Sequence, residues 1–138
     1  MDSTSIDLVG SRIVGVETEG DTVRVRFEPA YLIKTMTGSV ERTRWWQNGE
    51  LVFSAAQLED EGVRAALPAE CDGGDVSENI YTYRDMLPVP LESAGQASCS
   101  LKLKDSEHLL KVSGHGVSLE LEDVAKYIEH IRPTESAG

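Results

Sequence analysis

The chain has 138 residues, of which 40% are hydrophobic and 27% charged, and this composition is typical of a folded domain rather than of a disordered chain. Its 13 basic and 24 acidic residues give a net charge of −11, which opposes binding to the phosphate backbone of nucleic acids. The sequence contains no run of about 18 apolar residues, and its first ten residues lack the pattern of a leader peptide. We therefore expect one cytoplasmic domain over residues 1–138, with no nucleic-acid partner and no membrane partner.

The first elements expected along the chain are two strands joined by a tight turn. The segment "TVRVRFE" alternates strictly, with Val23, Val25 and Phe27 on one face and polar side chains on the other. A second apolar segment precedes it, and Gly20 between the two suits a tight turn. The pattern predicts a β-hairpin over residues 6–28.

The segment "RTRWWQNGELVF" then places Trp45 and Trp46 side by side in an expected strand, so the two indoles point to opposite faces. If Asn48 and Gly49 form a two-residue hairpin turn, Trp46 shares the core face with Leu51. If the strand instead continues through them, strict alternation puts Trp45 on that face. The other indole is either covered by another element or serves as a platform for a ligand or partner.

Two arginines in the same segment raise a question of charge. In the hairpin alternative, Arg42 and Arg44 share the face of Trp46, so a guanidinium approaches the core and needs an acidic partner or an anionic ligand. A β-bulge near residue 44, or a solvated position, removes the conflict. We treat Arg42, Arg44, Trp45 and Trp46 as candidate residues for binding a ligand or partner.

The middle of the chain is acidic and interrupted by glycine and proline. Residues 59–79 carry seven acidic residues and one arginine, as expected of a solvated loop or of an interface for a cationic protein. The following segment, "NIYTYRDMLPVPL", predicts an edge strand, because Pro88 and Pro90 cannot donate ladder hydrogen bonds. Tyr81 and Tyr83 share one face of this strand and are further candidate binding residues.

Three more strands are expected as a meander. "ASCSLKLK" alternates, and "HLLKVSG" and "GVSLELE" follow it, with turns at "KDSEH" and "SGHG". The side chains predicted to point inward are Ala97, Cys99, Leu101, Leu103, Val117, Leu119 and Leu121.

The end of the chain has helical spacing. Val124, Tyr127, Ile128 and Ile131 fall at i, i+3, i+4 and i+7, and Asp123 is a candidate N-cap. The spacing predicts an α-helix over about residues 123–132. Because so short a helix is marginal alone, we expect its apolar stripe to pack on an outer sheet face, where it would also cover the outer indole.

Together these elements predict a mainly β fold of about eight antiparallel strands, forming a barrel or a two-sheet sandwich, with one short C-terminal α-helix. The order of "RWWQNGELVFSAAQLE", "LPVPL", "ASCSLKLK" and "VSGHGVSLELEDVAKYIEHI" resembles a group of small uncharacterised bacterial β proteins that end in a Gly-rich turn, a strand and a Tyr-containing tail. The resemblance covers most of the chain from residue 12. It implies the β fold and no particular activity.

The sequence lacks the common catalytic and metal-binding patterns. His108 and His115 lie about 23 Å apart if they share one strand, too far to bind one metal ion, and "CDGGD" lacks the further carboxylates of a calcium loop. Neither a nucleophile elbow nor a phosphate-binding glycine loop is present. Cys71 and Cys99 form no CxxC pair and are expected to be free thiols. We expect no metal and no cofactor.

These features predict a non-enzymatic, acidic protein-interaction domain that associates with itself or with a basic protein partner. The alternative is a small-molecule carrier, in which a barrel interior binds an apolar or anionic ligand between an inward tryptophan and Arg44.

Overall fold

The structure is a computed structural model and describes residues 3–36, 38 and 40–131. In these residues, eleven strands form one antiparallel sheet, and the 3-10 helix η1 (Glu61–Ala66) is the only helix. The strands are β1 (Ser3–Asp7), β2 (Arg12–Glu19), β3 (Thr22–Thr35), β4 (Arg42–Phe53), β5 (Gln57–Leu58), β6 (Ala69–Glu78), β7 (Tyr81–Arg84), β8 (Met86–Val89), β9 (Glu92–Leu103), β10 (Leu109–Leu121) and β11 (Lys126–Ile131). The prediction of a mainly β fold is confirmed.

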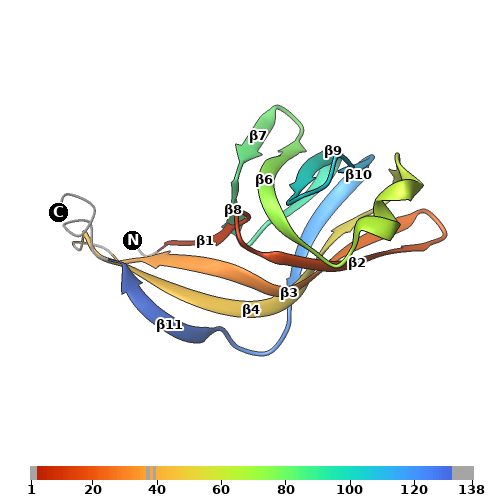
Figure 1. Cartoon of the computed structure of the whole chain (residues 1–138). Helices are drawn as coiled ribbons and strands as arrows, with labels where there is room; N and C mark the ends of the chain where they lie inside the picture. The colour runs from red at the N-terminus through yellow and green to blue at the C-terminus, as the bar shows by residue number, and fades with distance from the viewer. Residues whose placement is uncertain (1–2, 37, 39, 132–138) are drawn as a thin grey trace.

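Six of the strands close into a barrel (Figure 1). Each pairs with the next in the order β3, β4, β10, β9, β6 and β2, and β2 pairs with β3 to complete the circle. Of the two predicted architectures, a barrel and a two-sheet sandwich, the structure shows the barrel.

Inward side chains fill this barrel. In β3, Val23, Val25 and Phe27 are at most 2% exposed, and Leu51 and Phe53 of β4 lie opposite Val25 and Val23 with no exposed surface. The alternating side chains predicted for β9 are also buried, at Ala97, Cys99, Leu101 and Leu103. A barrel of six strands is narrow enough for its own side chains to occupy the interior.

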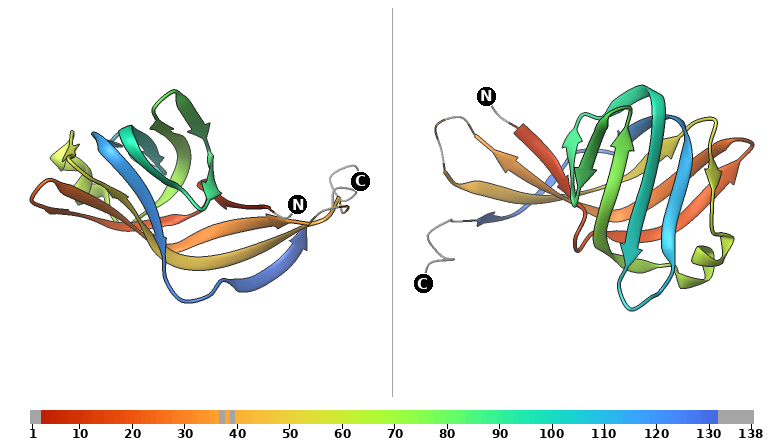
Figure 2. Two further views of the ribbon diagram at one scale, coloured as in Figure 1. Left: turned by 180° about the vertical axis from the view of Figure 1, so that it is seen from behind. Right: turned by 90° about the horizontal axis from the view of Figure 1, so that it is seen from above.

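Two of the barrel strands are longer than the barrel. A β-bulge interrupts the pairing of β3 with β4 between Phe27 and Ala30, and beyond it both strands continue away from the barrel as a hairpin. β1 extends this hairpin on the β3 side, and β11 extends it on the β4 side. We call this projecting sheet the wing and define it as β1, residues 29–36, 38 and 40–48, and β11; it lies to one side of the barrel in Figures 1 and 2.

The N-terminal hairpin is confirmed over β2 and β3, which meet at Gly20, whose φ of 62° suits glycine, but it begins at Arg12, and residues 6 and 7 belong to the separate strand β1. Other boundaries were wrong. "SGHG" is not a turn: β10 runs through it as one strand with a bulge after His115. Residues 59–79 are not a loop either, because they contain η1 and the barrel strand β6, in which Cys71 is buried.

The predicted C-terminal helix is wrong, because residues 126–131 form the strand β11. The helical stripe and the strand compete for the same tyrosine and isoleucine side chains, which also have high strand propensity. The projecting half of β4 has an edge that needs backbone partners, whereas a helix of this length gains little stability by itself. Residue 132, the last in the predicted helix, lies outside the described residues. No helix in the described part of the chain is long and apolar enough to cross a membrane.

Candidate functional site

The two tryptophans lie on opposite faces of the wing. β4 continues through Asn48 and Gly49, so the continuous-strand alternative is correct and the hairpin turn is wrong. Trp45 shares the inner face with Leu51, and Trp46 lies on the outer face. Gly49 is required for close packing rather than for a turn, since a Cβ there would lie 2.7 Å from the carbonyl oxygen of Glu120.

On the inner face, Trp45 is the centre of a polar and aromatic cluster. Its indole Nε1 donates to Thr43 Oγ1 over 2.8 Å, and the Lys34 ammonium lies 4.2 Å from the ring centroid. The Tyr127 ring meets Trp45 edge-on at 5.4 Å between centroids, and its hydroxyl lies 2.6 Å from Nδ1 of His130. Trp45 also packs against the barrel core. β11, rather than a helix, therefore covers part of this indole.

The outer face repeats the pairing of cation and ring. Lys126 Nζ lies 4.8 Å from the centroid of Trp46, and the Arg44 guanidinium lies 4.6 Å from the centroid of Tyr31. Between these two rings is an open hollow of about 430 Å³. Its lining residues are Glu28, Pro29, Tyr31, Trp46, Asn48 and Ile128. Large rigid aromatic side chains in such a hollow are typical anchors of protein interfaces.

The arginine conflict raised by the sequence does not arise. Arg44 lies on the outer face, where it forms an ion pair with Asp7 at 3.4 Å in addition to its contact with Tyr31. Its charge is thus balanced within the chain and needs no anionic ligand. Arg42 is exposed on the same face, opposite Thr35 of β3 and Ile131 of β11.

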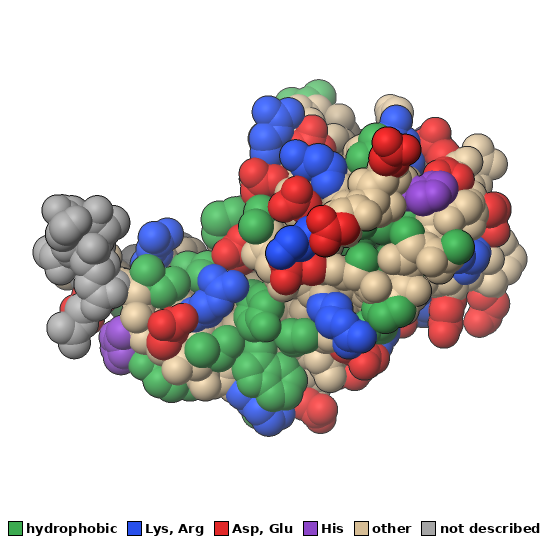
Figure 3. All heavy atoms as spheres, viewed as in Figure 1, with side chains coloured by type: hydrophobic (Ala, Val, Ile, Leu, Met, Phe, Trp, Pro, Cys, Tyr) green, Lys and Arg blue, Asp and Glu red, His purple; other side chains and the backbone are tan. Residues whose placement is uncertain are grey.

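The wing differs from the barrel in charge. It contains four of the 13 basic residues but only three of the 24 acidic ones, so the rest of the chain has nine basic and 21 acidic residues. Figure 3 shows one face of the molecule, with hydrophobic side chains gathered over the wing and lysine and arginine among them, while most of the acidic side chains in view lie over the barrel. The wing is therefore the part of this acidic protein where another protein meets the least negative charge.

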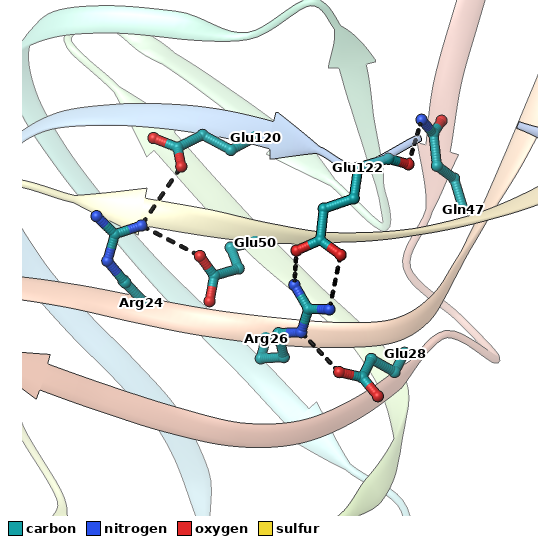
Figure 4. Close-up of polar contacts among 7 residues, drawn as sticks. All are labelled: Arg24, Arg26, Glu28, Gln47, Glu50, Glu120 and Glu122. Carbon is teal, nitrogen blue, oxygen red and sulfur yellow. Dashed lines mark hydrogen bonds and ion pairs between the residues drawn. The ribbon is translucent and has the colours of Figure 1, made fainter. Parts of the chain in front are cut away.

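An ion-pair network fixes the outer side of the barrel next to the wing (Figure 4). Arg24 of β3 reaches Glu50 of β4 and Glu120 of β10, and Arg26 forms a two-pronged contact with Glu122. Hydrogen bonds from Arg26 lower the pKa of Glu122, and that carboxylate in turn raises the pKa of the guanidinium. Each of these charged side chains has a partner of opposite charge, so the network stabilises the packing of β3, β4 and β10 against one another and offers no free charge for a ligand.

Gln47 links the barrel to the last strand of the wing. Its side chain is buried, and its Nε2 donates to the carbonyl oxygens of Glu122 and Asp123 over 3.0 and 3.1 Å. Figure 4 shows the contact with the Glu122 carbonyl oxygen. Glu122 and Asp123 come directly after β10 and precede β11. The amide therefore holds the segment that leads into β11.

The two candidate tyrosines lie elsewhere. Tyr81 and Tyr83 are on β7, which pairs with Glu78 and Val76 of β6 at these positions. Tyr81 is 59% exposed, whereas Tyr83 is half-buried against the core and its hydroxyl lies 3.4 Å from a carboxylate oxygen of Glu78. The structure thus brings Arg42, Arg44 and the two tryptophans together and leaves the tyrosines apart from them.

Sequence reasoning missed five residues of the wing: Tyr31, Lys34, Lys126, Tyr127 and Ile128. The first two follow Pro29, where the expected hairpin had already ended. The other three were placed on the predicted helix. Within "YLIK" and "KYI" the lysine and the tyrosine point to opposite faces of the strand, and each lysine lies over a tryptophan of β4 instead, so local spacing gave no signal for these contacts.

Other chemistry-bearing groups of the described residues lie apart from the wing, among them His108, whose Nδ1 lies 2.9 Å from a carboxylate oxygen of Asp60. His115 shares an open hollow of about 520 Å³ with Ser98, Ser113 and Asp21, but in the described structure its ring makes no hydrogen bond to either serine. Burial raises the pKa of the Cys71 thiol to about 11. It raises the pKa of the Cys99 thiol to about 12, and both thiols are free. Such thiols behave as small hydrophobic groups.

Metal-ligating side chains are also dispersed, since among residues 3–36, 38 and 40–131 no three of the His, Cys, Asp and Glu side chains are grouped to hold an ion.

Comparison of the chain with models of protein families, with curated proteins and with solved structures found no match. The functional argument therefore rests on the wing itself.

Proposed function

We propose that this protein is a non-enzymatic association domain that binds another protein chain through the wing, and that this chain is a second copy of the protein. One observation carries the proposal: the wing projects beyond the barrel with exposed apolar and aromatic side chains on a surface that is not acidic. Tyr127 is 50% exposed and Ile128 is 39% exposed, beside the two tryptophans. Tryptophan and tyrosine are enriched in the centres of protein interfaces.

Charge favours this surface for self-association. Two copies that each carry −11 repel one another most strongly where barrel meets barrel. Contact through the two wings keeps the acidic barrels apart, and at physiological salt charges separated by more than about 8 Å are largely screened. The proposal retains a cytoplasmic, bacterial setting for the protein, as expected from the sequence.

Binding of a basic protein is the other mode of association expected from the sequence. Such a partner would bind the acidic barrel, so its affinity would fall steeply with salt, whereas contact between wings would depend mainly on apolar area. The carrier alternative has less support. Because side chains occupy the barrel interior, a ligand would have to use a surface hollow such as the one beside Trp46.

Sedimentation velocity of the full chain, from about 1 µM to about 1 mM, tests the proposal over the range of weak association. We expect the weight-average mass to rise with concentration toward two chains. Ile128→Ser should reduce the rise, because it removes an exposed apolar side chain from the wing. Ile80→Ser is the matched control, since Ile80 is 89% exposed on the turn between β6 and β7. A single-chain mass at every concentration, or equal effects of the two variants, would reject the proposal.

A further inference from the structure

β11 ends the sheet at the wing. In the described part of the chain it pairs with β4 alone, so its other side presents backbone N–H and C=O groups without a strand partner. Such an edge binds another strand by extending the sheet. The opposite end of the sheet, β8, contains Pro88 and is followed by Pro90, which weakens it as a template.

β7 also has an open edge, but its surroundings are unsuitable for a second copy of this chain. Among the described strands it pairs with β6 alone; its one cation, Arg84, is held in an ion pair by Asp75 at 2.8 Å, and the carboxylates of Glu78 and Asp85 lie at its two ends. Two copies meeting there would bring these carboxylates together. β11 instead carries one cation and one anion, Lys126 and Glu129, on the same face.

The pairing of β11 with β4 shows which face each side chain occupies. Lys126, Glu129 and Ile131 lie opposite Trp46, Arg44 and Arg42, which places them on the outer face. Tyr127 and His130 lie opposite Trp45 and Thr43 on the inner face. A bulge between Tyr127 and Glu129 leaves Ile128 as the extra residue, and it lines the outer hollow beside Trp46. The order of faces is therefore outer, inner, outer, outer, inner, outer.

This order restricts how two copies of β11 can pair. Residues directly opposite one another in an antiparallel pair share a face, and a two-fold axis normal to the sheet keeps each face on its own side. Tyr127 opposite His130 satisfies this condition throughout β11: Lys126 is then opposite Ile131, and Ile128 opposite Glu129. Shifting the register by one or two residues in either direction places at least one inner side chain opposite an outer one.

The same register suits the charges. Lysine on an edge strand ordinarily opposes pairing with another strand. Here Lys126 of one copy lies diagonal to Glu129 of the other on the outer face, within reach of two long side chains. The backbone hydrogen bonds of the two strands and these two symmetric charge pairs would join the wings into one continuous sheet.

We infer that two copies of the protein associate through antiparallel pairing of β11 with β11, in the register that places Tyr127 of each opposite His130 of the other. The inference rests on the proposed function and specifies how the second copy binds. It assigns an interaction site to the C-terminal strand and predicts a two-fold symmetric dimer with the acidic barrels at its ends.

Disulfide trapping between variants that each carry one added cysteine tests this register. Lys126→Cys and Ile131→Cys are mixed as full chains under mild oxidation, and the mixed disulfide is measured by mass spectrometry. Residues directly opposite have Cα atoms about 4.5–5.5 Å apart, within the range of a disulfide, whereas diagonal positions are about 7–8 Å apart. The native cysteines are buried and should not compete.

Two mixtures serve as matched controls, Lys126→Cys with Glu129→Cys and Lys126→Cys with His130→Cys, which correspond to shifted registers. We expect the Ile131 mixture to give several-fold more mixed disulfide than either control. A larger yield in a control mixture would overturn the register. Dimers in sedimentation with no trapping in any mixture would overturn edge pairing and leave the proposed function standing. The absence of both dimers and trapping would overturn both.

Discussion

The side chain of Gln47 should be essential for holding β11 in place, and Gln47→Glu tests this with almost no change in shape. The substitution removes two hydrogen bonds, at 3.0 and 3.1 Å, and points a buried carboxylate at the carbonyl oxygens of Glu122 and Asp123. Each lost hydrogen bond costs about 1 kcal/mol, and burial of the unpartnered charge adds to this cost. We expect the free energy of unfolding to fall by about 2–4 kcal/mol, with Tm lower by roughly 10 °C.

The pH dependence gives the sign of the effect. Burial and the two carbonyl oxygens favour the neutral carboxyl group, so the pKa of this new glutamate should be higher in the folded state than the value of about 4.3 in the unfolded chain. The loss of stability should be complete above the folded pKa and should shrink as pH falls, because a protonated carboxyl group can donate one hydrogen bond.

Urea denaturation at several pH values measures both quantities. Gln96→Glu is the matched control, because Gln96 is exposed on β9. Equal losses for the two variants near pH 7, or a loss in Gln47→Glu that stays constant as pH falls, would refute the reasoning.

Three further predictions concern the barrel. Phe53→Ala should lower the free energy of unfolding by about 3–5 kcal/mol in urea denaturation, because Phe53 is fully buried; a loss below about 1.5 kcal/mol would mean that the core relaxes around the gap. Cys71 and Cys99 should react with a thiol reagent far more slowly in the native protein than after denaturation, since burial raises both pKa values; rapid native labelling would contradict this. Hydrogen bonds from Arg26 hold the pKa of Glu122 below its usual value, so the stability that this carboxylate contributes is present at pH values above the unfolded pKa and is lost as pH falls through the folded pKa. Glu122→Gln should therefore flatten the acid side of the stability profile, and an unchanged slope would count against that contribution.

The β fold was predictable because strict alternation of apolar and polar residues indicates a half-buried strand. Val23, Val25 and Phe27, and the four inward residues of β9, are placed by period two alone. Closure into a barrel was not predictable, because it depends on the pairing of β2 with β6 and of β4 with β10, which lie far apart in the sequence. Local sequence does not determine which distant strands meet.

One open alternative and two wrong predictions have physical explanations. Asn48 and Gly49 resemble a hairpin turn, but Gly49 is needed where Glu120 approaches closely, and the strand continues through it. "SGHG" resembles a turn, but its second glycine permits a bulge with a φ of 98°. In β11, the apolar side chains match helical spacing, but the segment forms a strand because it pairs with the edge of β4 that β3 leaves open.

Part of the candidate site was predictable and part was not. Neighbouring tryptophans in a strand must face opposite ways, so their division between two faces was predictable from Trp45 and Trp46 alone. Which face received each indole depended on Gly49. The lysines that lie over the two rings come from other strands, Lys34 from the neighbouring β3 and Lys126 from the distant β11, and only the strand pairing brings them to the tryptophans.

Amide hydrogen exchange of β11 as a function of protein concentration tests association through the wing most directly. The account predicts that protection of Lys126–Ile131 increases with concentration, while protection of a barrel strand such as β9 stays constant, because only the wing edge gains backbone partners. Exchange in β11 that is the same at all concentrations, or a concentration-dependent gain confined to the barrel, would contradict it.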